Sequence, residues 1–442
     1  MTHIIFKSIR VVNPDTNYDQ ISDVTVKDGK ILSIIKVVNI NTTNKKDNTP
    51  LYDCTGLTMA PGITDIRVNL GKTENIEAIQ KIAVQNGITS MVVLPNQTPR
   101  LDNPSIIDHL HRQSENPILP FIKAYGAATK DLDGLEMAEL GLMSEMGAVG
   151  FTNGNISIKN SLVMRRLMSY AAMINQPIIQ HAEDPDLSGL NEASTNSIKG
   201  EMNESETSTR LGLIGIPSCA EVIIIERDLR LAELTGVHYH VAHVSTKEAV
   251  DVIRNAKKRG LKITCDTAPP YFCLNETSLL NYDTAFKLSP PLRTEDDRLA
   301  IIEGIKDGTI DAIASDHRSR SKDTKAQPFS AASIGASGIE TLFLLTLELV
   351  HKNIISLNKA LAMITTKPAK LLKIEAPSLK EKEDATFFIF DDRTINKITQ
   401  EHMQTSPTPF DGRSVKGRVI GTFIKGRLAY VHEELNQKLI ND

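Results

Sequence analysis

Short apolar runs rich in β-branched residues alternate with helical patterns through the middle of this 442-residue chain. Strands that are apolar on both faces and are followed by helices indicate a parallel sheet covered by helices. Eight such units over roughly 250 residues predict a closed (β/α)8 barrel, the TIM-barrel architecture. A doubly wound open sheet is the alternative, but no Gly-x-Gly-x-x-Gly motif opens the first helix. The eight runs that we predict to be strands are Ile63–Asn69, Thr89–Pro95, Phe121–Ala127, Ala148–Thr152, Pro177–His181, His238–Ser245, Lys262–Thr267 and Asp311–Ser315.

Both ends of the chain carry further strand patterns. We expect the two groups to pair with each other, because each alone has few strands to bury a core. We therefore expect a small composite β-sandwich domain built from residues 1–60 and 373–442, beside a barrel over residues 61–372. A polar loop is expected over Asn39–Pro50. The strand patterns are Ile4–Val12, Ser22–Lys27, Ile31–Val38, Ala385–Phe390, Gly417–Ile424 and Arg427–His432.

Composition excludes several classes of function. The net charge is −4, which gives no electrostatic basis for binding nucleic acid. No apolar run reaches about 18 residues and no cationic leader is recognisable, so we expect no membrane span and a cytoplasmic location. The cysteines lack the paired spacing of zinc sites. In a reducing compartment we expect buried free thiols, at Cys54, Cys219, Cys265 and Cys273.

Polar residues stand where the predicted barrel strands end, which is where such barrels place their catalytic groups. A single histidine there is more often a hydrogen-bonded structural group than a metal ligand. Two histidines and an aspartate on three strands could nevertheless form a partial nitrogen and oxygen site for zinc. Spacing alone does not decide between the two interpretations. In chain order the strand-end residues are Arg67, Asn69, Asn96, Asn153, His181, His243 and Asp316.

An ordered set of short motifs resembles the dihydroorotases of the amidohydrolase superfamily over nearly the whole chain. That resemblance implies a zinc-dependent (β/α)8 barrel with a composite β-domain. It also implies the reversible cyclisation of N-carbamoyl-L-aspartate to dihydroorotate in pyrimidine synthesis. The motifs include Ala60-Pro61-Gly62, Leu94-Pro95-Asn96, Gly147-Ala148-Val149-Gly150-Phe151-Thr152, His181-Ala182-Glu183-Asp184-Pro185, His243-Val244-Ser245-Thr246, Pro290-Pro291-Leu292-Arg293, Ser315-Asp316-His317 and Thr408-Pro409-Phe410-Asp411-Gly412.

The resemblance assigns metal ligands, of which this chain keeps only part. His181, His243 and Asp316 match the ligands of strands five, six and eight, and Asp316 also matches the catalytic proton carrier. The His-x-His pair of strand one is replaced by Arg67 and Asn69, and Asn153 replaces the strand-four carboxylate. Arginine is cationic and has no lone pair for a metal. We therefore expect the Arg67 side chain to occupy the vacated metal position and to pair with Asp316.

The positions that bind substrate in the family are also altered. Asn96 is kept, whereas Gly71 stands where the family has a carboxylate-binding arginine. Ser289 replaces an asparagine, and Arg320 replaces a histidine. An arginine fork can still bind a carboxylate. A small carboxylate ligand held by Arg67, Asn96, Ser289 or Arg320 is therefore possible without a metal.

Three functions follow from these observations. The first is an inactive dihydroorotase homologue that serves as a structural partner of aspartate transcarbamoylase, because inactive barrels of this resemblance assemble with that enzyme. The second is an active cyclic amidohydrolase with one zinc ion at His181, His243 and Asp316. The third is a metal-free sensor of carboxylates. The expected cofactor is accordingly none or a single zinc, and the expected assembly is a homo-oligomer.

Overall fold

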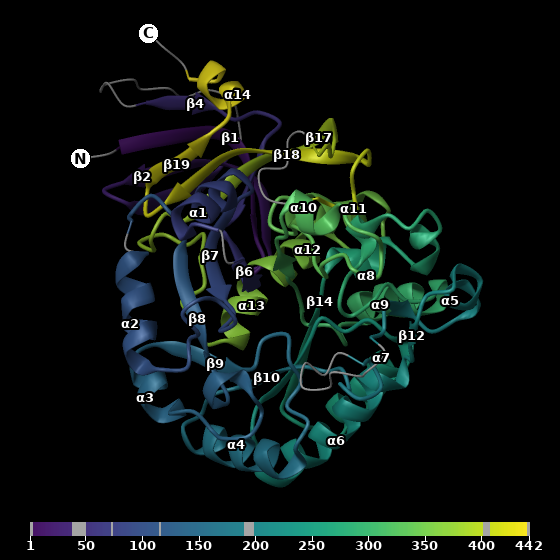
Figure 1. Cartoon of the computed structure of the whole chain (residues 1–442). Helices are drawn as coiled ribbons and strands as arrows, with labels where there is room; N and C mark the ends of the chain where they lie inside the picture. The colour runs from purple at the N-terminus through teal and green to yellow at the C-terminus, as the bar shows by residue number, and fades with distance from the viewer. Residues whose placement is uncertain are drawn as a thin grey trace.

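The chain folds into a barrel with a β-domain on one side, and both described ends of the chain lie in that β-domain (Figure 1). The structure is a computed structural model that describes residues 3–37, 50–71, 74–114, 116–189, 199–400 and 407–439. The polar loop expected over Asn39–Pro50 lies, apart from Pro50, outside the described residues. No helix in the described part of the chain is long and apolar enough to span a membrane.

The barrel sheet is parallel throughout, which confirms the predicted architecture. Its order is β15-β14-β13-β10-β9-β8-β7-β6-β16. Every pair of neighbouring strands is parallel, and β16 pairs with β6 to close the ring. The strands are β6 (Ile63–Asn69), β7 (Ile88–Val93), β8 (Phe121–Ala127), β9 (Ala148–Thr152), β10 (Ile178–His181), β13 (Tyr239–Ala242), β14 (Ile263–Thr267), β15 (Ala312–Ile313) and β16 (His317–Arg318).

The eighth strand differs from the prediction of one continuous run over Asp311–Ser315. It is split into β15, which pairs with β14, and β16, which pairs with β6. Asp316 lies between the two pieces with φ of +48°, a left-handed conformation that interrupts an extended strand. This break lets the eighth strand bridge its two neighbours while turning the Asp316 side chain toward the barrel mouth.

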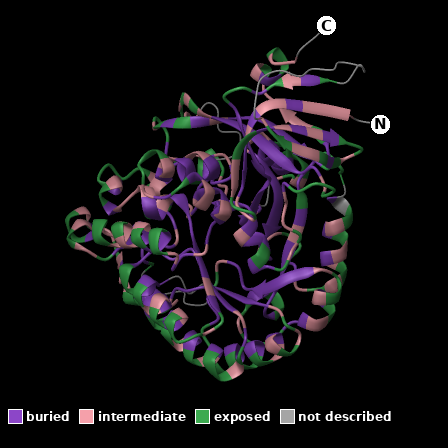
Figure 2. Cartoon of the chain, turned by 180° about the vertical axis from the view of Figure 1, so that it is seen from behind, coloured by how far each residue is buried: buried purple, intermediate pink, exposed green. Residues whose placement is uncertain are grey.

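Helices surround the sheet, and their apolar faces pack against it. Capping asparagines and threonines begin several of them, for example Asn160 before α4 and Thr246 before α7. Strands are buried while outer helix faces are exposed (Figure 2). The main helices are α1 (Ile76–Gln85), α2 (Pro104–Gln113), α3 (Leu140–Glu145), α4 (Ser161–Met173), α6 (Cys219–Thr235), α7 (Lys247–Lys258), α9 (Glu295–Asp307), α11 (Leu342–His351), α12 (Leu357–Ile364) and α13 (Thr366–Leu371).

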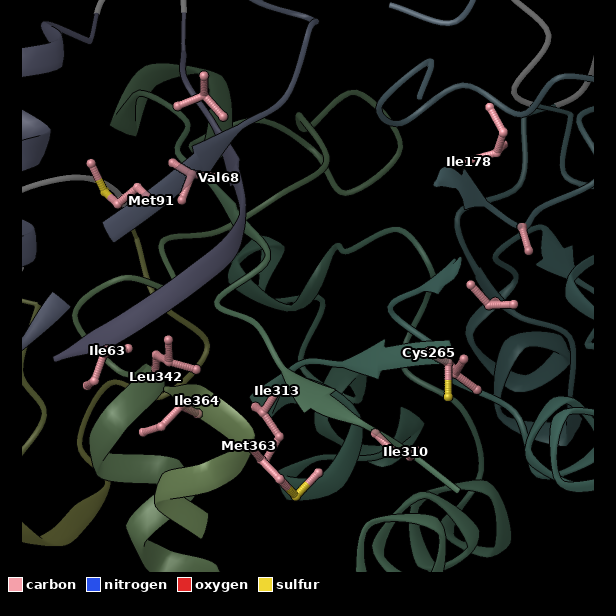
Figure 3. Close-up of a cluster of buried hydrophobic side chains, with 14 of the residues drawn as sticks. Ile63, Val68, Met91, Ile178, Cys265, Ile310, Ile313, Leu342, Met363 and Ile364 are labelled. Atoms are coloured by element: carbon pink, nitrogen blue, oxygen red, sulfur yellow. The ribbon is translucent and has the colours of Figure 1, made fainter. Parts of the chain in front are cut away.

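One apolar cluster fills the space between the barrel strands and the helices. Figure 3 shows Ile63 and Val68 of β6 on the same side of the barrel as Leu342 and Ile364 of the covering helices. All four side chains are at most 1% exposed. Because apolar burial contributes roughly 25 cal/mol per Å², burying this layer stabilises the packing of the helices on the strands.

The β-domain joins the two ends of the chain in one eight-stranded sheet, as expected for a composite domain. β5 pairs with β17 in antiparallel register and with β1 in parallel register. Phe6, Phe387 and Phe423 form its aromatic core. The strands are β1 (His3–Asn13), β2 (Tyr18–Lys27), β3 (Lys30–Lys36), β4 (Leu51–Asp53), β5 (Thr58–Pro61), β17 (Phe387–Lys397), β18 (Ser414–Ile424) and β19 (Arg427–Val431).

The cysteines are free, but the expectation that all four are buried is wrong. Cys54 and Cys265 are buried and Cys273 is partly buried. Cys219 is exposed because it is the first residue of α6, at the end of a helix that faces solvent. Burial raises the pKa of the Cys54 thiol to about 12, so this group is unreactive at neutral pH.

Candidate functional site

The carboxyl ends of the barrel strands bring four of the predicted residues together. Arg67 points inward from β6, His181 ends β10, His243 follows β13, and Asp316 lies between β15 and β16. Because all strands run the same way, their carboxyl ends meet at one mouth of the barrel. Direct hydrogen bonds connect all four side chains. The four side chains therefore lie together, while their roles in metal binding and catalysis stay predictions.

Arg67 occupies the centre of the mouth and is only 1% exposed. Its Nε donates to Asp316 Oδ1 at 2.9 Å, and its Nη2 donates to Asn155 Oδ1 at 2.8 Å. The expected pairing of Arg67 with Asp316 is confirmed. A buried guanidinium is tolerated only when its charge and its N–H groups have partners, and here a carboxylate and an amide oxygen supply them.

The two histidines and Asp316 form a short hydrogen-bonded chain. His181 Nδ1 lies 2.9 Å from His243 Nε2, and His243 Nδ1 lies 3.2 Å from Asp316 Oδ2. Burial, together with the neighbouring His243 and Arg67 side chains, holds the pKa of His181 well below its usual value, so His181 is neutral. Burial by itself raises the pKa of Asp316, but His243 and Arg67 outweigh it and hold this pKa well below its usual value. Asp316 is therefore a carboxylate.

This arrangement does not fit a metal ion. Both ring nitrogens of His243 face protein partners, and both oxygens of Asp316 are taken by Arg67 and His243. A ligand nitrogen must offer its lone pair to the metal, so a metal ion would have to replace these contacts. In the described part of the chain, no group of three histidine, cysteine, aspartate or glutamate side chains could hold a metal together.

The remaining positions of the altered ligand set lie apart from this cluster. Asn153 turns toward the loop after β8, where its Nδ2 donates to Thr129 Oγ1 at 2.7 Å and its Oδ1 accepts from Thr129 N at 3.1 Å. Asn69 ends β6 beside Arg318 of β16. Neither residue contacts His181 or His243 through a hydrogen bond.

The expected substrate-binding residues are engaged in contacts with the protein. Asn96 Nδ2 donates to Asn153 O at 3.4 Å, and its Oδ1 is buried without a partner. Ser289 Oγ donates to Glu183 Oε2 at 3.4 Å. Arg320 Nε donates to Ile334 O at 2.7 Å. Asn96 packs against Gly154, whose carbonyl lies 3.5 Å from Arg67 Nη2, and Ser289 lines the cavity beside Asp316. The substrate roles of Asn96, Ser289 and Arg320 stay predictions.

Sequence reasoning gave no role to a buried network behind the mouth. Glu221 of α6 accepts from the backbone N–H of Ser245 at 3.0 Å and lies 3.8 Å from Arg293 Nη2. Asp266 accepts from His243 N at 2.8 Å and from the His240 ring at 2.7 Å. These contacts fix the loop that presents His243. Arg293 stands in a recognised motif, so its position was visible in the sequence, whereas its partner on α6 was not.

A cavity of about 20 Å³ lies in the mouth, next to Asp316. One water molecule needs roughly 10–15 Å³ on this scale, so the cavity has room for one or two. Sites for organic ligands measure about 300–1,000 Å³. A larger cavity, of about 560 Å³, lies at the opposite end of the barrel, between strand beginnings such as Ala148 and the segment Ile374–Ser378.

Comparison with known proteins places the chain in a family. A model of the amidohydrolase family matches residues 72–429. The chain belongs to the amidohydrolase family. It is 38% identical to a dihydroorotase of Anaplasma phagocytophilum over 86% of this chain and 84% of that protein. It is 35% identical to a dihydroorotase of Syntrophus aciditrophicus over 97% of this chain and 99% of that protein. It is thus a dihydroorotase-like amidohydrolase.

Solved structures agree on the fold of this amidohydrolase. An L-hydantoinase (dihydropyrimidinase) from Arthrobacter aurescens superposes with a TM-score of 0.82 at 24% identity, covering 97% of this chain and 96% of the other. A dihydropyrimidinase from Brevibacillus agri gives a TM-score of 0.79 at 22% identity, covering 97% and 95%. At these identities the similarity shows the fold alone, which is the barrel with its β-domain.

Proposed function

We propose that this amidohydrolase is a catalytically inactive homologue of dihydroorotase, an enzyme of pyrimidine synthesis. We propose that it acts as a structural partner of another protein. The observation that carries the proposal is the position of Arg67. Its guanidinium is buried at the centre of the mouth and is bonded to Asp316 at 2.9 Å. A fixed charge in that position stabilises the carboxylate, but it can neither activate a water molecule nor polarise a carbonyl as a metal does.

The small size of the mouth cavity supports the same conclusion. The cavity beside Asp316 measures about 20 Å³, whereas sites that enclose organic ligands measure about 300–1,000 Å³. An active enzyme with one zinc at His181, His243 and Asp316 is the alternative. It requires the His181–His243 contact at 2.9 Å to open and Arg67 to leave. A carboxylate sensor built on Arg67 meets the same obstacle.

Metal content and turnover test this proposal together. The purified full-length protein, supplied with zinc and then desalted, is analysed for zinc per chain and assayed for dihydroorotate hydrolysis in the same preparation. We expect far less than one zinc per chain and no turnover above the blank. An active dihydroorotase of the family, prepared in parallel, controls for loss of metal. One zinc per chain with turnover contradicts the proposal and supports the mononuclear enzyme.

For the structural role we propose aspartate transcarbamoylase as the partner, following the resemblance. Exposed apolar side chains on the neighbouring outer helices α4 and α6 support a protein partner there. Met173 is 81% exposed and Leu234 is 68% exposed, and α4 packs against α6. Isolated apolar side chains are common on surfaces, so the pair is a starting point for mutation and not a site by itself.

Co-elution with aspartate transcarbamoylase of the same organism tests the partner. We expect a stable complex with the wild type and its loss in Met173→Glu with Leu234→Glu. Ile35→Glu is the matched control, because Ile35 is 63% exposed on β3 of the β-domain. Light scattering of the isolated chain tests the predicted homo-oligomer. Separate elution of the two wild-type proteins, at concentrations of several micromolar, contradicts the proposed partnership.

A further inference from the structure

Arg318 places a cation in the barrel mouth. It lies on β16, where its backbone N–H donates to Ala336 O at 2.9 Å. Its side chain makes no hydrogen bond or ion pair with the described residues, and its Nε is buried without an acceptor. Buried polar atoms are normally hydrogen-bonded, and an exception requires an explanation. A charged donor without an acceptor is the costlier case.

The Arg318 side chain lines the small cavity in the mouth. The acidic group on the same wall is Asp316, whose two oxygens already accept from Arg67 and His243. Arg320 and Arg67 add positive charge near Arg318, while Glu183 is an acidic neighbour without a direct contact. The cavity therefore presents an unneutralised guanidinium beside an ion pair that is already complete.

We propose that this cavity binds a small monovalent anion, with the Arg318 guanidinium as its principal ligand. The volume of about 20 Å³ restricts the anion to the size of one or two water molecules, such as chloride or formate. Ser289, Ser337 and Thr341 lie on the same walls, but their hydroxyls donate to Glu183, Glu340 and Gly338 O. The Arg318 guanidinium is therefore the donor that the cavity offers. Charge-assisted hydrogen bonds to an anion would satisfy the guanidinium.

This site differs from the carboxylate clamp expected from sequence. Of the residues expected there, Ser289 also lines this cavity. The Arg67, Asn96 and Arg320 side chains donate to other protein groups. The inference goes beyond the proposed function, because anion binding at Arg318 does not depend on whether the protein turns over dihydroorotate.

Thermal unfolding in chloride tests the site. Sodium gluconate, whose anion is too large for the cavity, is replaced stepwise by sodium chloride or sodium formate at constant ionic strength. We expect a saturable rise in Tm for the wild type. Arg318→Met should weaken the apparent affinity about tenfold or more, the usual effect of losing a charged hydrogen bond. Arg230→Met removes the same charge from the exposed face of α6 and should leave the response unchanged.

Two further measurements locate the site and limit its size. Line broadening in chloride NMR reports binding directly, and formate should reverse it. Arg318→Lys keeps a cation, so it should bind the anion more weakly than the wild type and more tightly than Arg318→Met. If the methionine variant does not fold, the lysine variant alone is compared with the wild type. The proposal is overturned if chloride produces no saturable effect, if the variants at position 318 respond like the wild type, or if the larger sulfate binds as well as chloride.

Discussion

Arg67→Met is the substitution that tests most directly what holds the barrel mouth together. It removes the donor to Asp316 Oδ1 and the donor to Asn155 Oδ1, in a position that is 1% exposed. Breaking a buried ion pair typically costs about 3–5 kcal/mol. The Asp316 side chain is 19% exposed and keeps its contact with His243, which places the expected loss of unfolding free energy at the lower end, at about 3 kcal/mol.

The loss should depend on pH in a defined direction. Arg67 and His243 hold the pKa of Asp316 below its usual value in the folded state. A carboxyl with a depressed pKa contributes stability above its unfolded pKa, near 3.9, and this contribution is lost as the pH falls toward the folded pKa. Arg67→Met removes most of that contribution. The wild type and the variant should therefore differ most near pH 7 and converge below about pH 4.

Urea unfolding followed by circular dichroism measures both effects. A double-mutant cycle with Asp316→Asn isolates the pair, and we expect a coupling energy of about 2 kcal/mol or more. Arg230→Met, on the exposed face of α6, is the control for loss of a positive charge. If Arg67→Met unfolds within about 0.5 kcal/mol of the wild type and the coupling is near zero, the guanidinium does not stabilise the mouth and the reasoning is refuted.

Three further predictions concern other parts of the molecule. The triple variant Arg67→His, Asn69→His and Asn153→Asp should take up zinc that the wild type does not, and unchanged metal content by mass spectrometry would contradict the interpretation of a vacated site. Burial raises the pKa of Asp228 to about 6 despite Arg227, so stability should rise as the pH falls from about 6 toward 4; Asp228→Asn should flatten that part of the profile in urea titrations, and an unchanged slope would argue against it. Phe388→Ala should cost about 3–5 kcal/mol, because the ring is fully buried in the main core; calorimetry showing an unshifted Tm would exclude such a role.

The architecture and the central cluster could be predicted because both depend on patterns that are local in sequence. Apolar runs of five to seven residues that alternate with amphipathic helices specify strands and covering helices, and parallel strands necessarily gather their carboxyl ends. Residues at those ends, such as His181 and His243, must then lie near one another. The Arg67–Asp316 pair followed from charge alone, since a buried guanidinium needs an anion.

Side-chain directions in the loops could not be predicted in the same way. Asn153 faces Thr129 because the loop after β8 offers both a donor and an acceptor there. The residues near Asn153 in sequence do not predict this contact. Arg320 Nε donates to the carbonyl of Ile334, whereas Arg318 Nε has no acceptor among the residues that the structure describes. The two arginines lie two residues apart and look equivalent in sequence. Only the packing of distant loops distinguishes them.

The charges in the mouth explain why a guanidinium and a zinc ion exclude each other there. Asp316 is the carboxylate that Arg67 contacts, and one positive charge balances it. A zinc ion bound to the same carboxylate would lie about 4 Å from the guanidinium. At an effective dielectric constant near 20 the repulsion is roughly 4 kcal/mol per unit pair, and about 8 kcal/mol for a divalent ion. Asn153 stands in place of a carboxylate and its side chain faces Thr129, so it does not offset this cost, and metal binding at Asp316 competes with Arg67.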